Sequence, residues 1–373
     1  MKFLRRNINT IFVMLGNGCN MNCRYCLQHP LVHKPLPPCI NPDIYEFFSQ
    51  VAEENPDGLI HLHFYGGEPL IYFDTIKQIV AEVRKRMIPS TYSVITNGRA
   101  ITDEMVRFFN KYDFNVTISW DGYQSNNSRR FDVFADPAQK DRILHIKYLG
   151  LSGVISSAAY PKEMLEAFQE ISDDFYQIFG YPVGVNLDSI MDTGLADKSL
   201  LDVDYERASK EMAEMAKSYL AHSLDKGANP FDEPIKRNYM DCLYEALRRF
   251  YIDRSGSWNR YTSACGNGLN VLNMDLQGNL YPCHNTSDKA GNIKDGFFGY
   301  LQKILAGDQT YLHREGCLNC PALAFCQGGC KLVDDEARRA TYCRLKRALF
   351  TPVLTVFLEA GTKLAKEGER HGG

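Results

Sequence analysis

The distribution of cysteines constrains this chain of 373 residues more than any other feature. Most of its 12 cysteines fall into two groups, one near the N-terminus and one between Cys265 and Cys343. The first group is Cys19, Cys23 and Cys26, in the stretch GNGCNMNCRYC. Reducing compartments keep thiols free, so clusters of this kind in a chain without a secretory signal favour metal ligation over disulfides. The cysteines therefore predict two metal-binding regions.

The N-terminus, MKFLRRNINTIFVMLGNGC, imitates a secretory signal because basic residues precede an apolar run. The unbroken apolar run covers only residues 11–15, and Gly-Asn-Gly before Cys19 is a poor cleavage context. We therefore expect a buried strand here, no membrane span anywhere in the chain, and a cytoplasmic protein. The formal net charge of −3 provides no broad basic surface for nucleic acid or an anionic membrane.

Short β-rich runs alternate with longer helical stretches up to about residue 190. The runs are TIFVMLG, LIHLHFYGG, TYSVITNG, NVTISWDG, GVISSAAY and PVGVNLDSI, and helices are expected to begin near Pro42, Phe73, Thr102, Ala138 and Pro161. This alternation predicts a parallel sheet, and six units are too few for a closed eight-stranded barrel. We therefore predict an α/β fold with a partial (β/α)6 TIM-like barrel whose chemistry lies at the C-terminal ends of the strands.

The character of the sequence changes twice after the barrel. Helical sequence fills roughly residues 203–254, and glycines and cysteines then replace long periodic runs. Such composition is typical of a small domain stabilised by metal rather than by a large core. We predict four parts: the barrel at 1–200, a helical bridge at 201–260, a cysteine-rich domain at 261–345, and a C-terminal helix and tail at 346–373.

The first three cysteines lie at the end of the first predicted strand. Three thiolates at this spacing can hold three corners of a four-iron cluster and leave the fourth iron without a protein ligand. Two alternatives remain open, namely a zinc site completed by His29 or His33, and buried thiols that bind no metal.

The pattern C-x3-C-x-aromatic-C, written here with Tyr25 before the last cysteine, resembles the signature of the radical S-adenosylmethionine (SAM) superfamily. The motifs YGGEP at 65–69, TNG at 96–98 and SWDG at 119–122 strengthen the resemblance. It implies one [4Fe–4S] cluster with SAM bound beside it. The implied SAM contacts are Tyr25, Gly66, Gly67, Glu68, Asn97, Ser119, Asp121 and Arg130, with Arg129 as the alternative to Arg130.

The chemistry of these residues suits the implied roles. Glycine carbonyls and the Glu68 carboxylate are suitable acceptors for the ammonium group of SAM. Alternation along a strand is expected to place Ser119 and Asp121 on one face, and it leaves Trp120 to pack against a helix. His61 and His63 also share a strand face, either as hydrogen-bonded histidines inside the barrel or as substrate contacts.

The C-terminal cysteines resemble, position by position, an auxiliary-cluster domain called SPASM, which occurs in maturases of peptides and proteins. The pattern is Cys265, Gly278-x4-Cys283, Cys317-x2-Cys320-x5-Cys326-x3-Cys330 and Cys343. The resemblance implies two auxiliary [4Fe–4S] clusters. The outer one is held by Cys317, Cys320, Cys326 and Cys343, and the nearer one is held by Cys265, Cys283 and Cys330.

Seven cysteines are one short of the eight iron corners of two such clusters. One corner is therefore open, or it is filled by a non-cysteine ligand or by Cys242. Cys39 and Cys242 are otherwise structural thiols. A zinc ribbon at Cys317 and Cys320 is the alternative explanation for that pair.

The resemblance implies an oxidising enzyme in which SAM is cleaved to a 5′-deoxyadenosyl radical that abstracts hydrogen. The expected activity is maturation of a ribosomally made peptide by a thioether or carbon–carbon crosslink. Expected partners are the precursor peptide or protein, an electron donor such as flavodoxin or ferredoxin, and a separate leader-recognition protein. Neither nucleic acid nor a membrane is expected as a partner.

Two alternatives belong to other classes. An anaerobic sulfatase maturase makes formylglycine from Cys or Ser, and such enzymes usually carry an aspartate base after the cysteine corresponding to Cys283. His284 occupies that place here, and it is our candidate general base. The other alternative is a non-catalytic binding protein stapled by metal.

Overall fold

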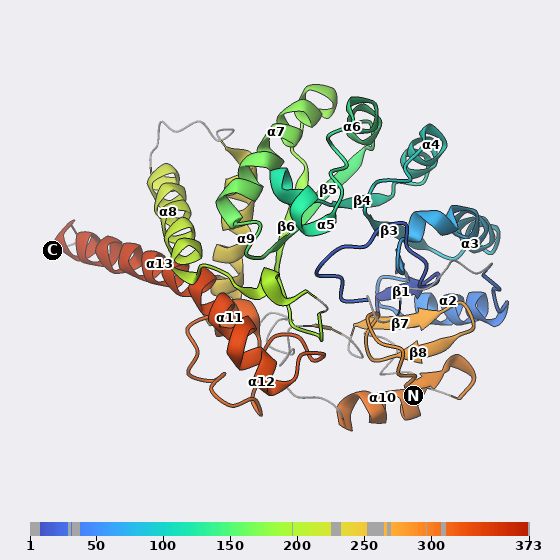
Figure 1. Cartoon of the computed structure of the whole chain (residues 1–373). Helices are drawn as coiled ribbons and strands as arrows, with labels where there is room; N and C mark the ends of the chain where they lie inside the picture. Colours follow the sequence, from blue (N-terminus) through green and yellow to red (C-terminus); the bar gives the residue numbers. More distant parts are fainter. Residues whose placement is uncertain are drawn as a thin grey trace. The chain divides into compact units, whose positions relative to one another are not determined.

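A computed structural model describes residues 8–28, 31, 38–195, 197–224, 233–251, 265–266, 270–295, 297–306 and 311–371. The possible zinc ligands His29 and His33 lie outside the described residues. The chain forms two compact units, which are described separately (Figure 1). Unit 1 comprises Met1–Trp120, Arg129–Leu151 and Cys265–Asp308; unit 2 comprises Asp121–Ser128, Ser152–Ala264 and Gln309–Gly373. The four-part division at 200, 260 and 345 remains a prediction.

Unit 1 is built on parallel strands rich in β-branched and aromatic residues. They are β1 (Thr10–Met14), β2 (Ile60–Tyr65), β3 (Ser90–Thr96) and β4 (Asn115–Ser119), paired in this order. In β2 the alternation is strict, since Ile60, Leu62 and Phe64 are fully buried and the intervening side chains face the other way. The predicted parallel α/β sheet is confirmed.

Helices follow these strands as the capping signals predict. Unit 1 contains α2 (Asp43–Glu54), α3 (Phe73–Lys85), α4 (Asp103–Lys111) and α6 (Pro137–Leu144). Thr102 accepts the backbone N–H of Met105 at the start of α4, and Asp136 accepts that of Ala138 ahead of α6. Figure 1 shows α3, α4 and α6 along the outer side of the strands.

Part of the cysteine-rich region joins the same sheet. β7 (Val271–Asp275) pairs in parallel with β1, and β8 (Asn279–Tyr281) and β9 (Gly291–Asn292) follow in antiparallel order. α10 (Phe297–Ala306) packs on β9. Cys265 and Cys283 therefore belong to unit 1, whereas the later cysteines belong to unit 2. The six strands expected from the sequence did not include this extension.

One strand is shared by the two units. β5 (Tyr148–Ile155) begins earlier than the run GVISSAAY predicts, because Leu149 and Leu151 extend the buried alternation backwards. The residues after Ile155 form a turn instead, with the Ser156 N–H bonded to the Ala159 carbonyl. β6 (Gly184–Ser189) ends the strand order β6-β5-β4-β3-β2-β1-β7-β8-β9.

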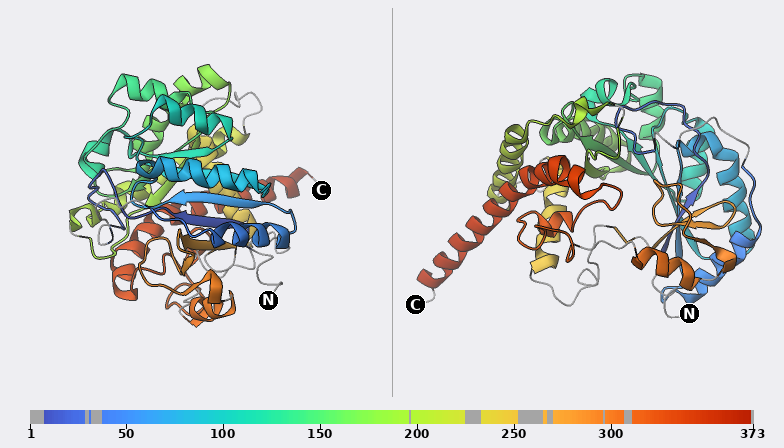
Figure 2. Two further views of the ribbon diagram at one scale, coloured as in Figure 1. Left: turned by 90° about the vertical axis from the view of Figure 1, so that its right-hand side faces the viewer. Right: turned by 60° about the horizontal axis from the view of Figure 1, so that its bottom comes forward.

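Unit 2 is mainly helical. It contains α5 (Ser125–Arg129) at its boundary, α7 (Pro161–Phe179), α8 (Tyr205–Leu224), α9 (Pro234–Tyr251), α11 (Leu323–Cys326), α12 (Asp335–Ala337) and α13 (Cys343–His371). α13 packs along α8, and its C-terminal end leads away from that helix (Figure 2). It begins at the last cysteine and continues through the expected tail to His371. Among the described residues, no helix is long and apolar enough to cross a membrane.

Candidate functional site

The YGGEP turn fixes the loop that carries the first cysteines. The Gly67 N–H donates to the Gly16 carbonyl at 3.0 Å, and the Glu68 N–H donates to the Gly18 carbonyl at 2.8 Å. A Cβ on Gly66 would lie 2.4 Å from the Gly16 oxygen, and one on Gly67 would lie 2.4 Å from the Gly18 oxygen. Only glycine permits this approach, so both glycines have a structural role besides the predicted contact with SAM.

Cys19, Cys23 and Cys26 follow this pinned segment in one partly exposed loop. The Cys26 N–H donates to the Cys23 carbonyl at 3.3 Å. Burial raises the pKa of the Cys19 thiol, and negative charge on Glu68 and on Cys26 raises it further. The thiols of Cys19 and Cys26 thus interact, as ligands of one cluster must.

Glu68 ties the C-terminal ends of β2 and β3 together. Its side chain is buried, and it accepts hydrogen bonds from the Thr96 hydroxyl at 2.6 Å, the Asn97 N–H at 2.8 Å and the Leu70 N–H at 3.0 Å. Burial raises the pKa of Glu68, whereas these donors and Arg129 lower it. A carboxylate has about four lone-pair sites, so these contacts leave room for an ammonium group.

Arg129, rather than Arg130, points into this region. Arg129 is buried, and its Nη1 donates to the hydroxyl of Tyr25 at 2.7 Å. Arg130 is exposed, and its φ of 61° places it in the left-handed region. The geometry therefore favours the alternative arginine. Asn97, the predicted ribose contact, is also buried, and its Nδ2 donates to Asn20 of the cysteine loop at 2.8 Å.

The SWDG motif differs from its expected strand geometry. β4 ends at Ser119, so the alternation that was expected to pair Ser119 with Asp121 does not reach Asp121. Asp121 belongs to unit 2, where it is buried and accepts hydrogen bonds from Ser128 and from the Val154 N–H. Trp120 packs edge-on against Phe134 and donates to Asp132 at 2.8 Å, instead of packing against a helix.

Two histidines of β2 form a hydrogen-bonded chain with β3. The Ser93 hydroxyl lies 2.5 Å from His63 Nδ1 and 2.6 Å from His61 Nε2, and His61 Nδ1 lies 2.8 Å from the Thr91 hydroxyl. Burial lowers the pKa of His63 to about 3, with further lowering by His61 and His284. The reading of these residues as hydrogen-bonded histidines of the barrel is supported.

His284 lies beside the same histidine chain. Its ring stacks on Phe12 with centroids 4.6 Å apart, and Tyr65 meets it edge-on at 4.4 Å. Burial lowers the pKa of His284 to about 4, so the imidazole is neutral and can accept a proton. The sequence gave no signal for Phe12 in this position, because its place on β1 looks like ordinary strand packing.

Cys265 and Cys283 both influence one tyrosine in unit 1. Burial raises the pKa of Tyr300, and negative charge on the two cysteines raises it further. The two thiols therefore lie on the same side of α10, as the predicted nearer cluster requires. Cys330, the third predicted ligand, belongs to unit 2, so the complete ligand set remains a prediction.

Four cysteines of unit 2 line one cavity of about 150 Å³. They are the predicted ligands of the outer cluster, Cys317, Cys320, Cys326 and Cys343. Burial raises the pKa of Cys326 to about 11, and the other three cysteines raise it further. Among the described residues, no three or more His, Cys, Asp or Glu side chains are placed to hold a single metal ion. A cubane cluster separates its ligands onto different irons, so a cavity of this kind suits it better than one zinc ion.

Two cations that the sequence analysis missed face this cavity. Arg338 is only 1% exposed, and its Nη1 lies 3.3 Å from the Cys343 sulfur and 3.8 Å from the Cys317 sulfur. The ammonium of Lys346 lies over the rings of Tyr342 and Phe350, 5.2 Å from each centroid. Four neutral thiols need no such cations, whereas an anionic iron–thiolate cluster does, so the lining fits the cluster.

The turn between Cys326 and Cys330 depends on left-handed backbone. Gln327, Gly328 and Gly329 have φ values of 45°, 87° and 74°. A Cβ on Gly329 would lie 2.5 Å from the ring of Tyr342. This tight packing explains the pair of glycines, and it directs the two cysteines away from a regular helix. Cys39 and Cys242, by contrast, are exposed.

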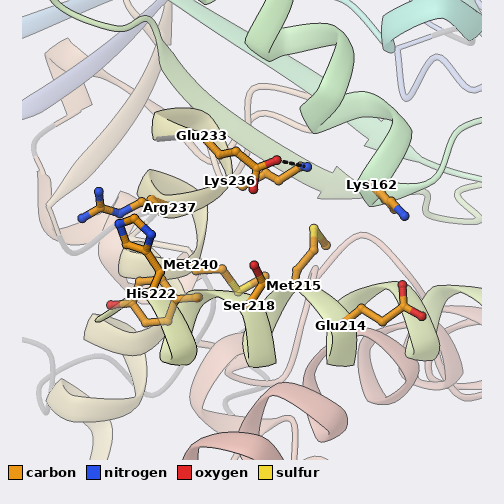
Figure 3. Close-up of a pocket in the computed structure, with 10 residues that line it drawn as sticks. Lys162, Glu214, Met215, Ser218, His222, Glu233, Lys236, Arg237 and Met240 are labelled. Carbon is orange, nitrogen blue, oxygen red and sulfur yellow. Dashed lines mark hydrogen bonds and ion pairs between the residues drawn. The ribbon is translucent and has the colours of Figure 1, made fainter. Parts of the chain in front are cut away.

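A second cavity of unit 2, of about 220 Å³, lies beside α8 and α9 (Figure 3). Its charged lining mixes cations, among them Lys236 and Arg237, with Glu214 and Glu233. Lys236 is already paired with Glu233 at 2.6 Å, as Figure 3 shows. None of the predicted cluster or SAM residues lines this cavity, and we assign no chemistry to it.

Comparison with known proteins places this geometry in context. A family model described as the radical SAM superfamily matches residues 13–175. Over 352 residues the chain is 21% identical to a radical SAM cyclopropyl synthase, TigE, of Paramaledivibacter caminithermalis, covering 87% of this chain and 68% of that protein. Over 364 residues it is 24% identical to a cysteine-type anaerobic sulfatase-maturating enzyme of Clostridium novyi, covering 87% and 88%.

A solved structure resembles the whole fold. The structure of native anSMEcpe with bound AdoMet and Cp18Cys peptide matches with a TM-score of 0.64 at 19% identity, covering 95% of this chain and 99% of that one. This likeness shows the α/β fold and not the activity. The matched family model covers β1 to most of α7, which includes the cysteine loop, the YGGEP turn and the ends of β3 and β4. Through residues 13–175 the chain therefore belongs to the radical SAM superfamily of enzymes.

Proposed function

We propose that this chain is a radical SAM maturase that oxidises a residue of a ribosomally made peptide and forms a thioether or carbon–carbon crosslink. The observation that carries the proposal is the cavity of unit 2, in which four cysteines and two cations surround one space. An auxiliary cluster there gives the enzyme a place to store an electron removed from the substrate. Similarity to a cyclopropyl synthase and likeness to a structure that holds a peptide support the proposed class of substrate.

The proposed SAM site is the loop of Cys19, Cys23 and Cys26 with the YGGEP turn. When bound, SAM and its reduced cluster supply a 5′-deoxyadenosyl radical. The remaining lone pair of Glu68 receives the SAM ammonium, and the glycine backbones hold the loop at the distance that this contact requires. We assign the carboxylate contact to Arg129 in place of Arg130, with Tyr25 orienting the guanidinium.

Crosslinking requires the removal of two electrons and two protons from the peptide. One hydrogen atom leaves with 5′-deoxyadenosine, one electron passes to an auxiliary cluster, and one proton goes to a base. We propose His284 as that base, because its neutral imidazole lies next to Cys283 and is held by Phe12 and Tyr65. An electron donor such as flavodoxin or ferredoxin, and a separate leader-recognition protein, complete the proposed partners.

The decisive experiment combines the anaerobically reconstituted chain with dithionite, SAM and short peptides encoded beside its gene. We expect 5′-deoxyadenosine and a peptide that loses a hydrogen pair for every crosslink, detected by mass spectrometry. The His284→Gln variant should slow peptide oxidation, and His145→Gln, which alters an exposed histidine, is the matched control. An intact peptide mass together with normal 5′-deoxyadenosine formation from every candidate peptide would contradict the proposal.

Sulfatase maturation is the second candidate, and the likeness to anSMEcpe over 95% of the chain favours it. The same assay distinguishes it, because a sulfatase-derived peptide would gain an aldehyde at Cys or Ser. Reaction of the product with a hydrazine probe reports that aldehyde. Histidine in place of the expected aspartate after Cys283 is the reason for ranking this candidate second.

A further inference from the structure

Arg338 faces the cysteine cavity with part of its guanidinium left over. Nη1 points to the sulfurs of Cys343 and Cys317, and Nε is paired with Asp335 at 3.0 Å. Nη2 is buried and has no hydrogen-bond partner among the described residues. A guanidinium keeps its charge at any physiological pH, and burying it half satisfied is costly unless an anion faces it.

An iron–thiolate cluster in this cavity supplies that anion. Cysteines that hold iron are deprotonated, and reduction adds one further negative charge to the cluster. A fixed cation beside the cluster therefore stabilises the reduced form more than the oxidised form. Lys346 adds a second positive charge on the side of Cys326, where its only charged opposing neighbour within electrostatic range is Asp188.

The other charged groups around the cavity are arranged differently. Arg339 is exposed and paired with Glu315 at 2.9 Å, and Arg347 is exposed on α13. Solvent screens such charges, whereas it does not reach Arg338. Arg338 also stands at the start of the π-helical turn η7 (Arg338–Tyr342), whose end leads directly into Cys343. The residue and the ligand are therefore fixed by the same piece of backbone.

We propose that Arg338 raises the reduction potential of the outer cluster and so makes this cluster the acceptor of the substrate's electron. The inference rests on the proposed function, because it needs the outer cluster. The substrate radical loses one electron and the cluster gains it, while the proton goes to the base. A flavodoxin or ferredoxin then reoxidises the cluster by taking the same electron.

The test is a potentiometric titration of the reconstituted full-length chain, followed by electron paramagnetic resonance. The signal of the outer cluster is the one that disappears in Cys320→Ala. Arg338→Gln should retain its iron and shift the midpoint to a more negative value, by at least a tenfold change in the reduction equilibrium, which is 59 mV for one electron. Arg338→Lys keeps the charge and should restore most of the potential.

Arg344→Gln is the matched control, because Arg344 is an exposed arginine next to Cys343 that lies over Tyr205 instead of facing the cavity. An unchanged midpoint in Arg338→Gln, or an equal shift in Arg344→Gln, overturns the inference. If Arg338→Gln loses iron, Arg338→Lys decides: retained iron with the original midpoint supports charge compensation, and lost iron shows a purely structural role. Wild-type protein without iron that depends on Cys320 refutes the outer cluster itself, a result independent of peptide oxidation.

Discussion

In unit 1 the first cysteines lie in a loop held by glycine backbones, with Glu68 and Arg129 as the buried charges nearby. In unit 2 the four cysteines line a cavity that Arg338 and Lys346 face. The buried charges in unit 1 offset each other, whereas those beside the unit 2 cavity are positive. A cluster that must give up an electron profits from surroundings that do not stabilise its reduced form, and a cluster that must accept one profits from the opposite. The contrast therefore assigns opposite electrical tasks to the two regions.

The strongest way to break this contrast is to remove one ligand from each region. Cys23→Ala should lower 5′-deoxyadenosine formation at least about a thousandfold, since no other route supplies the electron to SAM. Cys320→Ala should lower it less than about tenfold and should remove about four irons. Chromatography of the nucleoside and iron analysis measure the two outcomes. Equal losses of SAM cleavage in both variants would show that the regions do not have separate tasks.

Glycine substitutions test how each region is held. Gly67→Ala should cost about 1–3 kcal/mol and weaken SAM binding, because its Cβ meets the Gly18 carbonyl. Gly329→Ala should cost a similar amount but lower the iron content, because its Cβ meets Tyr342. Gly299→Ala is the control, since nothing lies within 4 Å of its Cβ. Thermal unfolding, SAM binding by calorimetry and iron analysis separate the three, and the idea fails if Gly299→Ala is as harmful.

Exchanging neighbouring arginines sharpens the comparison on the side of unit 1. Arg129→Gln should weaken SAM binding about tenfold, or about 1.4 kcal/mol, because it removes a buried charge. Arg130→Gln should change binding less than about twofold, because Arg130 is exposed. Calorimetric titration with SAM measures both values. A larger effect at Arg130 would restore the assignment made from the sequence.

The pH dependence of stability tests the uncharged interior of the barrel. The pKa of His63 is about 3 in the folded chain, below the ordinary 6.5, so its stabilising contribution is present above pH 6.5 and is lost as the pH falls toward 3. Between pH 7 and pH 5 the loss should be about 2 kcal/mol. His63→Gln should remove most of this slope, as measured by urea unfolding at both pH values. An identical slope in the variant would indicate that His63 titrates normally.

Local signals were sufficient to predict most of the barrel. The caps at Thr102 and Asp136 and the alternation in β2 are properties of neighbouring residues, so the corresponding elements were found within a few positions. The pairing of β7 with β1 is different, because more than two hundred residues separate the strands and no local pattern marks the partner. The early start of β5 was missed because its first residues resemble a loop after α6.

The candidate site shows the same division. Cysteine spacing predicted the group that lines the unit 2 cavity, since the thiols carry the pattern themselves. Nothing in the sequence distinguishes Arg338 from the neighbouring Arg339, because burial decides between them. The choice between Arg129 and Arg130 likewise depends on a left-handed residue in a turn. The roles of the site residues remain predictions for the experiments above.

The widened turn η7 has a consequence for how this chain can change during evolution. Five residues occupy it, ahead of a helix that runs on to His371. Deleting one of them would relax the turn to ordinary α-helix and rotate every later side chain by about 100° around the axis. Cys343 would then swing away from its three companions while the helix itself gained regularity. Selection for a more perfect helix and selection for metal therefore oppose each other at this point of the chain.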